Sequence, residues 1–129
     1  MLGALAVDPD QVRDRFSSGY LLAAATRLMG DVTLLRQRAA AVEQKLATLT
    51  IESELRFASP AAFRSFTADL AGALAALAAK YDQPSAKESR PFRVVVGSYP
   101  TVTKTPREAA AEAAAHQRKQ RRNSARRTR

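Results

Sequence analysis

The sequence predicts an α+β fold in which a long helix precedes a strand-helix-strand unit and a partly helical or disordered basic C-terminal tail. Two observations predict the unit: apolar and polar residues alternate over residues 49–57, and an apolar stripe with helical spacing follows from residue 60. A third is the apolar run within residues 92–99, which is typical of a strand contacted on both faces. A domain this small has little stability to spare, so burial against a second chain would help it.

The long helix is predicted by a heptad pattern of apolar residues. These residues follow one another at alternating spacings of four and three, as the a and d positions of a coiled coil do. They are Leu21, Ala25, Leu28, Val32, Leu35, Ala39, Val42 and Leu46. Such a seam needs a partner helix, which is either the same helix of a second copy or the helix that begins at residue 60 of the same chain. We expect the dimer.

The first predicted strand, residues 49–57, has one apolar and one polar face. The apolar face consists of Leu49, Ile51, Ser53, Leu55 and Phe57, and the polar face of Thr48, Thr50, Glu52, Glu54 and Arg56. Because successive side chains of a strand point to opposite sides, we expect the first face to cover a core and the second to meet water.

The second predicted helix begins at Pro60 and ends near Tyr81. Ser59 can accept a hydrogen bond from an unpaired N–H of the first turn, and proline at the first helical position sacrifices no hydrogen bond. The apolar stripe consists of Phe63, Phe66, Leu70, Leu74, Leu77 and Tyr81. A helix that connects two neighbouring strands makes them parallel and the connection right-handed. The exposed edges of so small a sheet again favour a dimer.

Two segments of the chain, from Tyr20 to Tyr81 and from Arg90 to Pro100, resemble the C-terminal region of winged-helix transcriptional regulators of the arsenic-repressor (ArsR-like) group found in actinobacteria. The strongest elements are the runs TLTIESELRFASPAAF and RPFRVVVGSYP. In such regulators the N-terminal winged helix-turn-helix enters the major groove of DNA. The region after it is expected to dimerise and to sense conditions. The resemblance therefore implies a dimerisation and effector-sensing module.

Little of the chain precedes the long helix. Only MLGALAVDPDQVRDRFSSG stands there, so we expect a truncated or split regulator without its winged helix. Its partner would be a second copy or an intact related regulator. Within this stretch Asp8 and Pro9 are typical of the start of a short helix. The expected domains are a linker or short helix at 1–19, a dimerisation and effector domain at 20–100 and a basic tail at 101–129.

The tail carries most of the net charge of +9. Residues 1–100 hold twelve Lys or Arg and ten Asp or Glu, whereas residues 101–129 hold nine and two. Thr105 and Glu108 form a capping-box pattern with a proline between them, which predicts a helix from Pro106 to about Gln120. No large apolar residue is available to dock it, so we expect the helix to fray into disorder.

Two interpretations of the tail remain open: electrostatic binding of DNA or RNA, and a solvated terminus without a partner. The residues that would neutralise phosphates are Arg118, Lys119, Arg121, Arg122, Arg126, Arg127 and Arg129. No aromatic residue lies among them, which disfavours single-strand binding by base stacking. Sequence-independent nucleic-acid binding through the tail is the alternative function of the chain.

The sequence predicts no enzyme and no catalytic, cofactor or metal site. It contains no cysteine, which excludes disulfides and thiolate-bound metals or metalloids. The one histidine, His116, lies in the tail, where no pocket can desolvate or orient it. No apolar run approaches the roughly 18 residues that span a bilayer. The leading MLGALAV lacks the positive charge of a signal peptide, so we expect a cytoplasmic protein.

Overall fold

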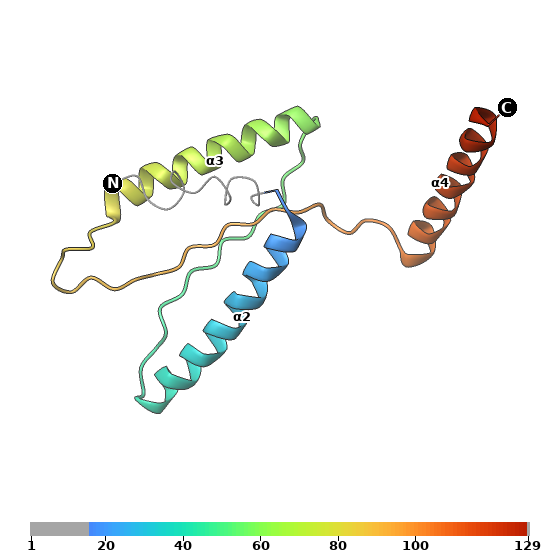
Figure 1. Cartoon of the computed structure of the whole chain (residues 1–129). Helices are drawn as coiled ribbons and strands as arrows, with labels where there is room; N and C mark the ends of the chain where they lie inside the picture. Colours follow the sequence, from blue (N-terminus) through green and yellow to red (C-terminus); the bar gives the residue numbers. More distant parts are fainter. Residues whose placement is uncertain (1–15, 129) are drawn as a thin grey trace. The chain divides into compact units, whose positions relative to one another are not determined.

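The computed structural model describes residues 16–128, and all regular secondary structure in that range is α-helical (Figure 1). The helices are α2 (Ser18–Ala41), α3 (Pro60–Tyr81) and α4 (Pro106–Arg127). The chain divides into two units: Met1–Val95, with α2 and α3, and Val96–Arg129, with α4. The short helix expected at Asp8 and Pro9 lies outside the described residues, as does Arg129 of the tail.

The predicted α+β fold is wrong, because none of the described residues belongs to a strand. Residues 49–57 and 92–99 run as irregular chain and form none of the ladder hydrogen bonds of a sheet. The side chains of the supposed core face meet solvent, with Leu49 82% and Ile51 83% exposed. Alternation fixes which way side chains would point in a strand. A strand also needs neighbouring backbone, and two short strands by themselves are at best marginally stable in water.

The start of α2 is capped by Ser17. Its side-chain oxygen accepts a hydrogen bond from the backbone N–H of Tyr20 at 3.2 Å. Because the first four N–H groups of a helix have no partner within it, this bond satisfies a donor that would otherwise depend on water.

The end of α2 is a Schellman motif. The N–H of Gln44 donates to the carbonyl of Ala39 at 2.9 Å, and the N–H of Glu43 donates to the carbonyl of Ala40 at 3.1 Å. Glu43 has a φ of 54°, in the left-handed region that glycine usually occupies at this position. The chain therefore turns sharply after Ala41, before the predicted heptad pattern ends.

The start of α3 confirms the predicted cap. Ser59 Oγ accepts a hydrogen bond from the N–H of Ala62 at 3.1 Å. Just upstream, the ring centroid of Phe57 lies 5.3 Å from that of Phe63 and 5.0 Å from that of Phe66. Aromatic contacts of this kind contribute about 0.5–1.5 kcal/mol beyond the area they bury. They fix the direction in which the chain enters α3, much as a hydrophobic staple does.

The start of α4 confirms the predicted capping box. The N–H of Glu108 donates to Thr105 Oγ1 at 3.2 Å, and the N–H of Thr105 donates to Glu108 Oε2 at 2.9 Å. Lys104 forms an ion pair with Glu112 across the first turns of the helix. These contacts satisfy two orphan donors and place negative charge near the positive end of the helix dipole.

The end of α4 lies at Arg127, well beyond the predicted end near Gln120. Alanine, arginine, lysine, glutamine and glutamate all have high helix propensity, and they make up most of α4. Arg126 and Arg127 lie in the last turn, where cations interact favourably with the negative end of the helix dipole. The basic part of the tail is thus helical through Arg127.

Candidate functional site

Exposed apolar surface is the main feature of the described residues. None of residues 16–128 is buried, and twenty large apolar side chains among them are exposed. Single apolar residues are common on protein surfaces, but a folded domain buries the rest of its apolar side chains in a core. The apolar helix faces are therefore the first candidates for an interaction site.

The predicted seam lies mostly on α2. The helix carries Leu21, Ala25, Leu28, Val32, Leu35 and Ala39, whereas Val42 is the C-cap residue and Leu46 follows the turn. Leu21, Val32, Ala39 and Leu46 are half-buried and the other four are exposed. Two further apolar side chains, Leu22 and Met29, widen the stripe and are 69% and 63% exposed.

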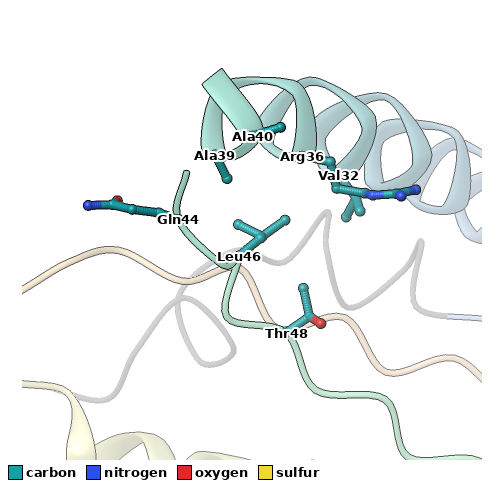
Figure 2. Close-up of a pocket in the computed structure, with 7 residues that line it drawn as sticks. All are labelled: Val32, Arg36, Ala39, Ala40, Gln44, Leu46 and Thr48. Carbon is teal, nitrogen blue, oxygen red and sulfur yellow. The ribbon is translucent and has the colours of Figure 1, made fainter. Parts of the chain in front are cut away.

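A hollow of about 370 Å³ lies at the C-terminal end of this stripe (Figure 2). It is lined by Val32, Arg36, Ala39, Ala40, Gln44, Leu46 and Thr48. Figure 2 shows Leu46 beneath the last turns of α2, on the side from which Ala39 projects. The Schellman turn brings Leu46 there, which explains why Ala39 is half-buried. A small molecule would fit by volume, but no lining side chain is buried to desolvate it.

The predicted nucleic-acid residues lie on the C-terminal half of α4, except for Arg129, which is outside the described range. All of the described ones are exposed. At 3.6 residues per turn, five of the six fall within about 160° of the helix circumference. These five, called the basic face below, are Arg118, Lys119, Arg121, Arg122 and Arg126. Arg127 lies on the opposite side of the helix.

Apart from the seam and the basic face, the described residues offer few candidate catalytic or metal-binding groups. His116 is exposed on α4, with its Nε2 atom 3.0 Å from Nε2 of Gln120. Arg56 and Glu54 form an exposed ion pair at 3.8 Å. No group of three or more His, Cys, Asp or Glu in residues 16–128 could hold a metal ion. Within the same range no helix is long and apolar enough to cross a membrane.

Sequence reasoning missed the turn at Glu43 and the return of Leu46 toward α2. Helices that end in this motif usually carry glycine or asparagine at the left-handed position, and this chain has neither there. The heptad spacing also continues through Val42 and Leu46, so the apolar pattern alone favours a longer helix. No signal in the sequence marks the turn.

Comparison with known proteins gives no relative. No family model, no curated protein and no solved structure matches this chain. The function must therefore be argued from the surfaces of the chain itself.

Proposed function

We propose that this chain is a dimerisation module of a DNA-associated regulator, whose hydrophobic core forms between two chains. The observation that carries the proposal is the absence of any buried residue among residues 16–128, although apolar residues line α2 in heptad spacing. Apolar area removed from water contributes about 25 cal/mol per Å². Pairing of the α2 stripes would remove such area from both chains at once.

The resemblance to ArsR-like regulators supplies the proposed class of partner. A second copy of this chain would give a homodimer, and an intact related regulator would give a heterodimer. Because such regulators act on DNA in the bacterial cell, the proposed compartment is the cytoplasm. An effector site is not part of the proposal, since the hollow beside α2 has no buried side chain to hold a ligand.

Sedimentation velocity of the full chain, and of residues 1–103, tests the dimer. We expect both to sediment as dimers at tens of micromolar, because the shorter chain keeps all of α2 and lacks only α4 and its capping box. A monomer of the full chain at that concentration would overturn the proposal.

Leu34 and Leu35 provide a matched pair for the same measurement. They are neighbours on α2, are 44% and 43% exposed, and differ in that only Leu35 belongs to the seam. We expect Leu35→Lys to weaken dimerisation by at least about tenfold, since burial of one leucine is worth about 1.5–3 kcal/mol. Leu34→Lys should leave the dimer nearly unchanged. Equal effects of the two substitutions would mean that the seam is not the interface.

A second candidate function is nucleic-acid binding through α4. What favours it is the basic face, which gathers five cations on less than half of an exposed helix. Cations so placed neutralise phosphates and release counterions, giving binding that does not depend on base sequence. The two functions are compatible, because they use separate helices.

A further inference from the structure

The seam of α2 has charged residues on both flanks. With leucines 21, 28 and 35 at d positions, Asp31 takes a g position and Arg36 an e position. Both residues lie on the helix and neither takes part in an ion pair among residues 16–128. They are five residues apart, so their side chains leave the helix about 140° from each other and cannot pair within one chain.

A parallel, in-register pair of α2 helices would bring these charges together. In that arrangement a g residue faces the e residue of the next heptad on the other helix, five positions later. Asp31 of each copy would then face Arg36 of the other.

Antiparallel pairs fit the charges less well. With the helices fully overlapped, Asp31 would face Asp31 of the other copy, because g residues then face g residues. A shift by one heptad removes that repulsion, and in one direction it sets Asp31 against Arg38. It leaves only seam residues 21–32 or 28–39 of each helix paired, depending on the direction. Val32 at an a position agrees with the parallel arrangement as well, since a β-branched residue at a with leucine at d favours two-stranded parallel coils.

We infer that two copies of this chain pair through α2 as a parallel, in-register coiled coil, with Asp31 of each copy bonded to Arg36 of the other. The inference rests on the proposed dimerisation and adds to it the orientation, the register and the residues that select them. Exposed ion pairs contribute little affinity. These charges therefore determine the orientation and register of the two helices, and burial of the leucines stabilises the pair. Gly30 agrees with this geometry: it takes the outermost f position, and nothing lies within 4 Å of a Cβ placed there.

Single-cysteine variants of the full chain test the orientation, because the natural sequence has no cysteine. In a parallel pair, residue 21 of one copy lies beside residue 21 of the other, within disulfide reach. In the overlapped antiparallel pair it lies beside residue 39, about 27 Å away along the helix. In a glutathione redox buffer, Leu21→Cys alone should form linked dimers. An equimolar mixture of Leu21→Cys and Ala39→Cys should give no mixed disulfide by intact mass.

Charge reversal tests the register independently. Asp31→Arg and Arg36→Asp should each weaken dimerisation about tenfold, and the double variant should recover the native dissociation constant. Arg27→Asp is the control for Arg36→Asp, because residue 27 lies on the outer side of the helix. Recovery in the double variant can arise only between chains, since the two residues do not touch within one.

The outcomes separate this inference from the proposed function. A natural chain that sediments as a monomer overturns both. A natural dimer in which the mixed disulfide predominates, or Leu21→Cys does not link, or the double variant does not recover, overturns the parallel register alone.

Discussion

Among residues 16–128, Glu43 is the one non-glycine residue with a left-handed backbone conformation. Its φ of 54° is left-handed, which costs a residue with a Cβ about 1–2 kcal/mol. Glycine has no Cβ and adopts this conformation freely. We therefore expect Glu43→Gly to stabilise the end of α2 by about 1 kcal/mol, or roughly fivefold in the local opening constant. Amide hydrogen exchange of Gln44 measures this, because its N–H closes the turn onto Ala39.

The control for this change is Glu43→Ala. It removes the same carboxylate from the negative end of the helix dipole but keeps the Cβ, so only the backbone effect separates the two variants. Gln44 protection that rises equally in both variants would assign the gain to charge and not to the left-handed conformation.

At the scale of the element, α4 has the basic face as its distinguishing feature. Each phosphate contact contributes about −0.9 to the slope of log K against log salt concentration for duplex DNA. We expect the full chain to bind a labelled duplex with a steep slope, and residues 1–103 not to bind near physiological salt. Arg122→Gln should reduce the slope by about 0.9, whereas Arg127→Gln, on the other side of the helix, should change it little. Fluorescence anisotropy across a salt series measures all four chains.

Equal slope changes in the two glutamine variants would contradict a defined basic face. The tail would then bind as a flexible cationic segment in which every arginine is equivalent. Unchanged binding by residues 1–103 would remove α4 from nucleic-acid contact altogether.

The helix starts and the predicted strands differ in how well the sequence predicts them. Helix starts were predictable from local chemistry: Ser59 and Thr105 cap their helices through bonds to N–H groups three residues away, so residues close in sequence carry the signal. The chain around Ile51 was not predictable in this way. Its alternating pattern is that of a strand, but strand formation depends on backbone from elsewhere, and no described segment supplies it.

The candidate site also has a part that the sequence predicts and a part that it does not. The heptad positions from Leu21 to Ala39 and the basic face on α4 follow from spacing, because a helix converts spacing directly into a shared face. The turn at Glu43 does not, since a non-glycine residue in the left-handed region has no sequence signature. Leu46, whose spacing continues the seam, therefore lies beneath the end of the helix instead of on it.

At the scale of the whole molecule, stability should depend on protein concentration. Residues 16–128 include no buried residue within one chain, so under the proposed dimerisation a large part of the hydrophobic stabilisation comes from association. A tenfold rise in concentration contributes about 1.4 kcal/mol to an association equilibrium. We expect the midpoint of thermal unfolding, followed by ellipticity at 222 nm, to rise by several degrees over that range. Binding of an apolar dye per chain should fall as the chains pair.

The matched variants Leu35→Lys and Leu34→Lys also test the concentration dependence of stability. The first should need at least about tenfold more protein to reach the same midpoint and the same low dye binding, while the second should behave as the natural chain does. A midpoint that stays constant with concentration in the natural chain would mean that each chain is stabilised without a partner. The exposed leucines of α2 would then have to be explained by something other than dimerisation, because burial between copies is the only source of stability that concentration can change here.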